Sequence, residues 1–345
     1  MERVSTIGLD LAKQVFQVHG LSKDGKKVFS RKLEREELHA FFKKQRGCVV
    51  AMEATSSAHH WARLIAILGH TPRLIPAQYV KPYLKREKSD ALDAEAIANA
   101  ARQPGMRFVA IKSADQQSIT TLMKTRTLFI RQRTSAVNSL RGLLAEFGFV
   151  VPARLANVAK LKRILHSDEM RVPEVARTAL KGVYQHIEAI DQQIEAVEKS
   201  IDEEVSKDAT VQRLMTVPGV GKITAMSIRA FVPDAALFKS ARHFASWLGI
   251  TPRSISSGGK QLYGHISKRG NAELRKLLVL GAFPIVTWAK KPACSNPWLR
   301  SLANRKPYKV AAVAVAHRTA RIVWSLLSKG GTYRPLPDET QAIAS

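Results

Sequence analysis

The chain has 345 residues, 45% of them hydrophobic, which is enough for about two or three domains with buried cores and argues against wholesale disorder. Lysine and arginine number 55 against 28 aspartates and glutamates, so the formal net charge is +27. A surface this basic favours a polyanionic partner, of which nucleic acid is the most common. An anionic membrane, or basic character without a specific partner, is the alternative.

Cysteine usage and hydropathy narrow the protein class further. Cys48 and Cys294 are the two cysteines, and they offer neither a disulfide framework nor the paired spacing of structural zinc. The longest apolar stretch, residues 277–289, is too short to span a bilayer and contains Pro284. The N-terminus enters a predicted strand with no signal-peptide pattern. We therefore expect a cytoplasmic protein, nucleoid-associated if it binds DNA, with no membrane partner.

The first hundred residues are predicted to contain three consecutive strands and then alternating helices and strands. The first expected strand ends at Asp10, the second covers residues 15–19 and the third covers residues 27–31. An Asp24-Gly25 turn joins the second strand to the third. The later elements are a helix at 34–46, a strand at 48–53, a helix at 58–69, a strand at 71–75 and a helix at 90–102. This is the order of ribonuclease-H-like folds, an analogy that does not by itself define an activity.

Two long helices are predicted next. Residues 116–147 form a basic helix that includes Arg126, Arg131 and Arg133. The helix that starts near residue 174 has apolar residues in alternating steps of three and four, a heptad seam: Leu180, Val183, Ile187, Ile190, Ile194, Val197 and Ile201. Nine acids against four Lys/Arg between 174 and 208 suggest packing on the basic helix or on another subunit. An ordinary amphipathic helix of one domain would give the same pattern.

The last part of the chain is the most basic, with 22 Lys/Arg and five acids from residue 206 onwards. It begins with Val-Pro-Gly-Val-Gly-Lys at 217–222, which predicts a tight turn between two helices. Gly219 and Gly221 would let the backbone approach a phosphate, and the helix start at Lys222 would favour an anion. A plain helix–helix turn is the alternative. The pattern does not match a nucleotide-binding P-loop.

Four carboxylates occupy positions that would suit a metal-dependent nuclease. Asp10 and Glu53 each end a short apolar strand, whereas Asp90 and Asp93 lie three apart on one face of a predicted helix. Carboxylate oxygens are ligands that Mg²⁺ and Mn²⁺ prefer, and a pair of such ions can assist both the attacking and the leaving oxygen in phosphodiester cleavage. We therefore predict a metal site, although solvated acids would share this composition.

A second constellation surrounds the run Ser-Ser-Gly-Gly at 256–259. A serine on a glycine-flanked loop among cations suits attack on a phosphate, because cations stabilise the developing charge, and suits phosphate binding equally. Cations near this loop and near the acids are candidate nucleic-acid contacts, with solvated side chains as the alternative: Lys13, Lys88, Arg253, Lys260, His265, Lys268 and Arg269.

Several motifs occur in order along the chain: Gly-Leu-Asp-Leu-Ala-Lys at 8–13, Met-Glu-Ala-Thr at 52–55, Lys-Ser-Asp-Ala-Leu-Asp-Ala at 88–94, Val-Pro-Gly-Val-Gly at 217–221, and the run from Thr-Pro-Arg to Lys-Arg-Gly at 251–270. Together they resemble the DEDD transposases of the insertion-sequence one-ten family, and its eleven-eleven subgroup in particular. The resemblance extends over nearly the whole chain, from about residue 4 to residue 330.

The resemblance implies roles for individual residues. The Asp-Glu-Asp-Asp set of the family corresponds to Asp10, Glu53, Asp90 and Asp93, and its catalytic serine corresponds to Ser257. Some family members have Glu-Ser-Gly where this chain has Ser256-Ser257-Gly258. Two adjacent hydroxyl groups therefore compete for the assignment, and position favours Ser257.

The resemblance also implies a domain organisation and partners. We expect a RuvC-like, ribonuclease-H-like catalytic domain at 1–106, a helical coiled-coil arm at 107–206, a mainly helical transposase domain with a helix-hairpin-helix-like element at 207–330, and a tail at 331–345. The implied partners are double-stranded DNA at the element ends and target, and a structured guide RNA encoded beside the gene. Because the acids and the serine lie in distant domains, we also expect further copies of the chain, in a dimer or tetramer through the heptad arm.

We therefore expect a transposase or recombinase that uses the metal-bound acids and Ser257 to cleave and exchange DNA strands through a covalent phosphoserine link. A RuvC-like junction resolvase that uses water, with Ser257 as a phosphate contact, is the alternative. A DNA-binding protein with structural acids is a third possibility. Sugar kinases and actin-like ATPases share the order of elements but need glycine-rich nucleotide loops that the sequence lacks.

Overall fold

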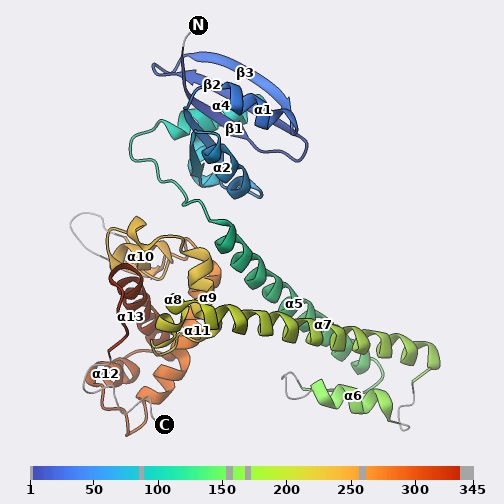
Figure 1. Ribbon diagram of the computed structural model, residues 1–345. Helices are drawn as coiled ribbons and strands as arrows, with labels where there is room; N and C mark the ends of the chain where they lie inside the picture. Colours follow the sequence, from blue (N-terminus) through green and yellow to red (C-terminus); the bar gives the residue numbers. More distant parts are fainter. Residues whose placement is uncertain (1–2, 85–88, 153–157, 168–171, 256–261, 335–345) are drawn as a thin grey trace. The chain divides into compact units, whose positions relative to one another are not determined.

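The computed structural model describes residues 3–84, 89–152, 158–167, 172–255 and 262–334. The chain forms two compact units, residues 1–115 and residues 116–345 (Figure 1). The first unit combines a β-sheet with helices, and the second is mainly helical. Each unit has its own hydrophobic core.

A five-stranded sheet forms the centre of the first unit, in the order β3-β2-β1-β4-β5. The three antiparallel strands are β1 (Val4–Asp10), β2 (Val15–Ser22) and β3 (Lys27–Glu34). The strands β4 (Val49–Glu53) and β5 (Thr71–Ile75) add to β1 in parallel. The predicted order of elements is confirmed, but β2 and β3 are longer than expected because buried Leu21 and Leu33 extend the core to their outer ends.

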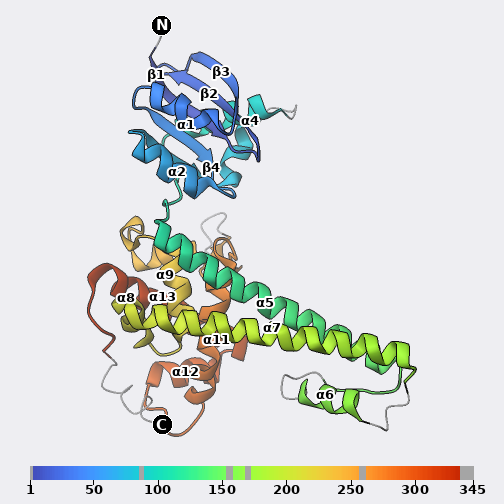
Figure 2. The same ribbon diagram turned by 45° about the vertical axis from the view of Figure 1, so that its right-hand side comes forward.

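Helices cover both faces of the sheet (Figures 1 and 2). The helices α1 (Glu37–Lys44) and α2 (Ala58–Ile67) pack on the face that carries Ile7, Leu9 and Met52. The helix α4 (Asp90–Ala101) covers the opposite face with its alanine-rich side, where it packs with Ala51 and Ile75. This division follows the alternation of side chains along β1 and β4.

One helix end differs from the prediction, and two short helical elements were not predicted. The start of α1 at residue 34 was wrong because β3 continues through Glu34, and the backbone N–H of Arg35 still donates to the Gln14 carbonyl at 2.9 Å. The short helix α3 (Ala77–Val80) and the 3₁₀ turn η1 (Lys81–Tyr83) were not predicted. Both lie between β5 and α4, where no clear apolar period marks a helix.

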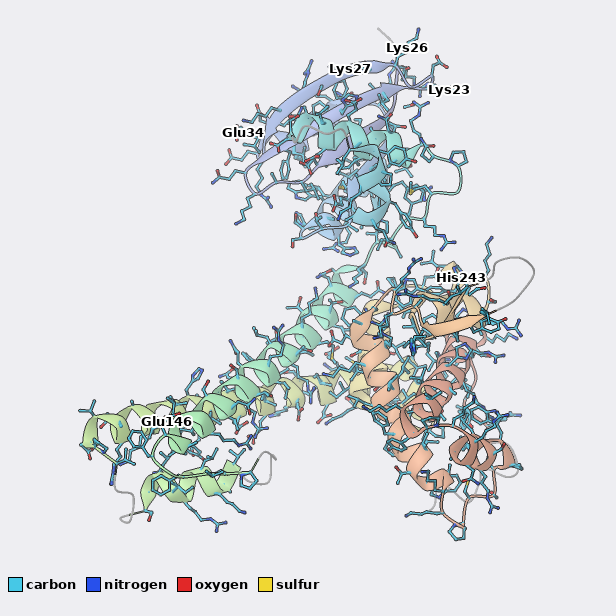
Figure 3. All side chains as sticks on the ribbon, turned by 180° about the vertical axis from the view of Figure 1, so that it is seen from behind. Lys23, Lys26, Lys27, Glu34, Glu146 and His243 are labelled. Carbon is cyan, nitrogen blue, oxygen red and sulfur yellow. The ribbon has the colours of Figure 1, made fainter. Side chains whose placement is uncertain are left out.

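The turn between β2 and β3 forms a positively charged tip. Its predicted Asp-Gly signal is confirmed, since Gly25 has a φ of 86°. The guanidinium of Arg102, after α4, donates to two carbonyl oxygens of this hairpin at 2.7 Å each. Lys23, Lys26 and Lys27 are exposed and project from the hairpin (Figure 3).

Two long helices lie side by side in the second unit, α5 (Ala114–Ala145) and α7 (Glu174–Lys207), as both Figure 1 and Figure 2 show. Arg126 of α5 pairs with Glu198 of α7, and Arg133 pairs with Asp191, so the helices run in opposite directions. The structure confirms that the acidic helix packs on the basic helix within the chain.

The apolar seam of α7 faces inward along its length. Leu180, Ile187, Ile190, Ile194 and Ile201 are buried. The first part of the seam packs with α6 (Val158–His166), and the last part joins the core of the C-terminal bundle. One helix therefore connects two hydrophobic clusters, which explains why its apolar pattern is longer than a single small domain needs.

In its described residues, the C-terminal bundle contains six α-helices, a 3₁₀ turn η3 (Ala235–Leu237) and one small hairpin. The helices are α8 (Ala209–Met215), α9 (Lys222–Phe231), α10 (Ala241–Trp247), α11 (Ala272–Ala289), α12 (Pro297–Arg305) and α13 (Tyr308–Lys329). The antiparallel hairpin joins β6 (Pro252–Ser254) to β7 (Tyr263–Ile266). Within the described part of the chain, α13 is the one helix long and apolar enough to cross a membrane, but its inner face packs on α10 and α11 as a core helix.

Candidate active site

The first two predicted acids end neighbouring parallel strands. Asp10 is the last residue of β1 and Glu53 the last residue of β4, and each follows directly on the paired residues Leu9 and Met52. Because side chains alternate along a strand, Asp10 shares the face of Gly8 and Glu53 shares the face of Ala51. That is the face covered by α4.

A close contact between backbones brings α4 to these strand ends. A Cβ atom on Gly8 would lie 2.1 Å from the carbonyl oxygen of Ala94 and 2.6 Å from the nitrogen of Ala98. Any larger residue at position 8 would push the helix away, so glycine is required for this packing. The sequence prediction gave Gly8 no structural role, although a glycine inside a strand is itself a signal of close approach.

The other two acids lie in the first turn of α4. The Ser89 hydroxyl caps the helix by accepting from the Leu92 N–H at 3.4 Å. Asp90 and Asp93 follow in the first turn, where the helix dipole stabilises negative charge. A cap, an acidic first turn and alanines on the packing side therefore deliver two carboxylates to the end of β1.

Three of the four carboxylates converge. Asp10, Asp90 and Asp93 can each place one oxygen so that all three lie within 4.8 Å of one another, and we call these residues the carboxylate cluster. The described residues contain no other such group. Glu53 is not within this distance, so the predicted four-acid set is a cluster of three with a fourth acid beside it. Glu53 is still near enough for its charge to act on Asp10.

The electrostatics of the carboxylate cluster fit a divalent cation. Burial, and then the charges of Asp93, Asp90 and Glu53, raise the pKa of Asp10 from 3.8 to about 6, while a hydrogen bond from the backbone of Leu11 opposes this shift. Among the described residues, the site therefore concentrates negative charge. Hard carboxylate oxygens at this spacing suit Mg²⁺ or Mn²⁺, whose binding would relieve the repulsion.

Of the two lysines predicted beside the acids, the structure describes Lys13 but not Lys88. Lys13 is exposed in the connection between β1 and β2, and its backbone carbonyl accepts from Arg35 at 3.2 Å. Its ammonium group stays a predicted phosphate contact. Lys88 lies outside the described residues.

A basic groove occupies the second unit beside the β6–β7 hairpin. Its volume is about 1680 Å³. Its cationic or titratable residues, which define the basic groove here, are Arg253, His265, Lys268, Lys309, His317, Arg318 and Arg321. No Asp or Glu lines the groove among the described residues. The groove is therefore suited to an anionic ligand.

The basic groove is lined by three of the predicted nucleic-acid contacts, Arg253, His265 and Lys268, and by further cationic or titratable residues that the prediction did not name. Arg253 donates to the Ser267 carbonyl at 3.0 Å, and Lys268 adopts a positive φ of 55°. His317 comes from α13, where burial, and then the charges of Arg321 and Arg242, lower its pKa below the usual value. The missed residues lie some fifty positions further along the chain, and their signal is a basic row on an otherwise apolar helix.

Ser256, Ser257 and Lys260 lie outside the described residues. Arg269 is exposed, but its backbone carbonyl oxygen lies 2.0 Å from where a Cβ on Gly249 would be, so its main chain is part of a tight loop contact.

The helical arm gives two predicted nucleic-acid contacts a different role. Arg126 donates to Glu198 at 2.6 Å, and Arg133 donates to Asp191 at 3.3 Å. These arginines hold α5 against α7, and their charges are largely neutralised by the acids. Arg131 is exposed on α5 and stays a predicted nucleic-acid contact.

The glycine-rich turn between α8 and α9 is also shaped by packing. Gly219 has a φ of 79°, and a Cβ there would lie 2.6 Å from the carbonyl oxygen of Gly281 in α11. This contact, and not room for a phosphate, accounts for the glycine at 219. Gly221 precedes α9 with open space beside it, and Lys222 forms an ion pair with Asp202 at 2.7 Å. Phosphate binding at Gly221 and Lys222 stays a prediction.

Two family models match separate parts of the chain. A family model described as "Transposase", of the IS110 DEDD type, matches residues 7–149, which include all four predicted acids. A second model, described as "Transposase IS116/IS110/IS902 family", matches residues 211–299, which include the glycine-rich turn and the serine loop.

Individual relatives match along nearly their whole length. A protein of Pseudomonas aeruginosa named "Probable family 20 transposase" is 44% identical over 96% of this chain and 99% of its own. The transposase for insertion sequence element IS1111A of Coxiella burnetii is 37% identical over 97% of this chain and 92% of its own. The transposase for element IS1328 of Yersinia enterocolitica is 34% identical over 96% and 99%. The chain therefore belongs to the IS110 family of insertion-sequence transposases, enzymes that recombine DNA.

Proposed function

We propose that the chain moves its own insertion sequence by cleaving and exchanging DNA strands, with the carboxylate cluster and Ser257 as its two chemical centres. The observation that carries this proposal is the convergence of Asp10, Asp90 and Asp93 at the carboxyl end of the central strand β1. The strand order of the first unit is also that of ribonuclease-H-like, RuvC-like nucleases, and it agrees with this function without defining it.

The residues present fit a divalent metal. Asp10, Asp90 and Asp93 would hold Mg²⁺ or Mn²⁺, with Glu53 as a further oxygen ligand or a second-site ligand. When bound, the metal would stabilise negative charge on a scissile phosphate and on the leaving oxygen. The chain contributes rigidity: the Gly8–Ala94 contact fixes the distance from β1 to α4, and the Ser89 cap fixes the start of α4. Acids fixed in this way would hold the metal at one place beside the end of β1.

The proposed covalent step is a balanced exchange of phosphodiester bonds. The hydroxyl oxygen of Ser257 forms a bond to phosphorus, the bond from phosphorus to one DNA oxygen breaks, and that oxygen takes a proton while the serine gives one up. A DNA hydroxyl from the partner strand then attacks the phosphoserine and releases the serine. The phosphodiester energy is retained, so no nucleotide cofactor is needed. The cationic residues of the flanking hairpin support this role through charge stabilisation.

We propose further that a structured RNA encoded beside the gene guides the choice of target, and that the chain acts as a dimer or tetramer. Support for the RNA is the family and the basic surface of the second unit, which suits any polyanion. Support for assembly is that the two proposed chemical centres belong to different units of the chain, so that two copies of the chain could complete a site together. A foldable non-coding segment and short element ends in the flanking DNA are the expected genomic features.

The chemical proposal is tested by trapping protein–DNA adducts on a labelled element end. Wild-type protein and the Ser256→Ala variant should form an adduct that survives denaturation, and Ser257→Ala should form none. An adduct in Ser257→Ala but not in Ser256→Ala would move the nucleophile by one residue. Full cleavage of branched DNA by Ser257→Ala without any adduct would instead indicate a resolvase that uses water.

A further inference from the structure

A second cavity lies beside the basic groove. Its volume is about 390 Å³, within the usual range for small-ligand sites. Trp298 and Arg318 line both cavities, so these two side chains form a shared wall. A ligand that enters the basic groove is therefore next to the second cavity.

The walls of this second cavity are mainly aromatic and apolar. We call it the aromatic pocket, and its lining residues include Trp288, Trp298, Tyr333, Pro218, Pro284 and Leu299. Polar groups are few: Lys291, Arg318 and Thr319. Flat apolar walls with a small number of hydrogen-bonding groups are suited to a planar heterocycle.

The family motif in the glycine-rich turn helps to build this pocket. The Gly219–Gly281 contact holds the turn on α11, and this places Pro218 in the pocket wall. On the other side, the backbone N–H of Tyr333 donates to the hydroxyl of Thr216 at 3.2 Å, just before the turn. The pocket is thus fixed by backbone contacts and not by side-chain packing alone.

The shared wall is a stacking surface. The guanidinium carbon of Arg318 lies 4.8 Å from the ring centroid of Trp298, and Trp298 is 41% exposed. Trp298 is held at the start of α12, where the Asn296 side chain caps the helix by accepting from Leu299 at 3.0 Å. Indole and guanidinium planes are the two kinds of side chain on which unstacked bases are commonly held.

We propose that the basic groove and the aromatic pocket together bind an unpaired segment of the DNA strand, with its phosphates on Arg253, Lys309 and Arg321 and one base in the aromatic pocket against Trp298. This inference rests on the proposed function, because strand exchange requires that the exchanged strand leave its duplex. Phosphate contacts alone would explain the cations, but not an aromatic cavity that shares their wall. The absence of acids from the described lining of the basic groove disfavours a cationic ligand.

The test compares binding of single-stranded and duplex DNA of one sequence, about 12 nucleotides long, by the full-length protein without divalent metal. Fluorescence anisotropy of labelled DNA gives both affinities. We expect the wild type to prefer the single strand, and Trp298→Ala to weaken single-strand binding between about 5-fold and 100-fold while changing duplex binding little. Trp298→Phe should restore most of the loss, because it restores a stacking face. Arg321→Gln should weaken the binding of both single-stranded and duplex DNA. It should also lower the slope of log affinity against log salt concentration by about 1, the value for one lost phosphate contact.

Phe108→Ala is the matched control. Phe108 is also an exposed aromatic residue under a guanidinium, that of Arg73 at 5.0 Å, but it belongs to the first unit. It should leave both affinities unchanged. An unchanged single-strand preference in folded Trp298→Ala would overturn the proposal, and so would a Trp298-dependent preference seen with RNA of the same sequence but not with DNA. No cleavage occurs in this assay, so a failure of the serine mechanism would leave its result intact.

Discussion

The carboxylate cluster and the basic groove are opposites in charge and in construction. In the first unit, three acids converge, and burial together with the charges of the neighbouring acids raises the pKa of Asp10. In the second unit, cations line a groove with no acid among its described lining. The acids of the first site suit a metal, and the cations of the second suit a polyanion. Nucleic-acid phosphate suits both sites, since phosphate binds metal and arginine alike.

The two sites also depend on different kinds of contact. The carboxylate cluster is set by backbone approach, because Gly8 allows α4 to touch β1. The basic groove is set by long side chains from a hairpin and from helices far apart in the sequence. A single substitution should therefore reduce the activity of the first site strongly, but reduce ligand binding in the second site only partly. The following predictions test this difference in order of expected effect.

Asp10→Asn should reduce metal-dependent strand cleavage by about 100-fold or more, since a central metal ligand is lost from the site. Single-stranded DNA binding without metal should stay unchanged. Both are measured on one preparation, by cleavage of a labelled element end and by anisotropy. Glu95→Gln is the control: Glu95 is also in α4 but lines a different cavity, with His19 and Lys27. Equal loss in both variants would mean that the cluster has no special role.

Gly8→Ala should lower the free energy of unfolding by about 2–3 kcal/mol and abolish metal-dependent cleavage, because the added methyl group would displace α4. Chemical denaturation measures the first effect. Gly182→Ala in α7 is the matched control, since nothing lies within 4 Å of a Cβ there. That change should stabilise the protein by about 0.5–1 kcal/mol. A tolerated Gly8→Ala would contradict the backbone contact on which the cluster depends.

The metal-free protein should lose stability as pH rises through the raised pKa of Asp10. Because the folded pKa is about 6 and the ordinary value is 3.8, the stabilising contribution is complete below pH 3.8 and is lost as pH passes about 6. Partial exposure and screening limit the change to about 1–2 kcal/mol. Unfolding followed from pH 4 to pH 7 checks this, with Asp10→Asn as the comparison that should show a shallower slope. Adding Mg²⁺ at pH 7 should restore stability in the wild type only.

Substitutions in the pair of long helices α5 and α7 should have the smallest effect on stability. Replacing Arg126 by Gln removes an ion pair whose partners are 23% and 34% exposed, so we expect a loss of about 0.5–1 kcal/mol. A double-mutant cycle with Glu198→Gln should return a coupling energy of the same size.

DNA affinity should fall more in Arg131→Gln than in Arg126→Gln, because the Arg131 side chain takes no part in the ion pair with Glu198. A larger loss of DNA affinity in Arg126→Gln would instead indicate that Arg126 contacts nucleic acid.

Local patterns in the sequence were sufficient for most elements of the first unit and for the two long helices of the second. The short apolar strands, the Asp-Gly turn and the alanine-rich helix predicted the order of elements along the first unit and a site of four acids, of which Asp10, Asp90 and Asp93 converge. The ends of α1 and the short α3 could not be predicted, since sheet pairing and burial decide them. The partners of Arg126 and Arg133 depend on which helices pack together, and a net charge count does not show this.

The structural role of the motif residues also depends on tertiary packing. The glycine at 219 looked like a phosphate contact in sequence, but its neighbour is Gly281, some sixty residues away. Trp298 and Arg318 have no local pattern that joins them, and only the packing of α12 on α13 forms their stacked pair. The candidate acids were therefore predictable from strand ends and helix spacing, whereas the groove and the pocket needed the fold.

The central claim is that the carboxylate cluster and Ser257 act in one strand-exchange reaction. Its most direct test is a denaturing gel of labelled element DNA incubated with Mg²⁺ and wild-type, Asp10→Asn, Ser256→Ala or Ser257→Ala protein. The account predicts a covalent adduct with wild-type and Ser256→Ala protein and none with Asp10→Asn or Ser257→Ala. Strand exchange by Ser257→Ala, or an adduct of normal yield in Asp10→Asn, would contradict it.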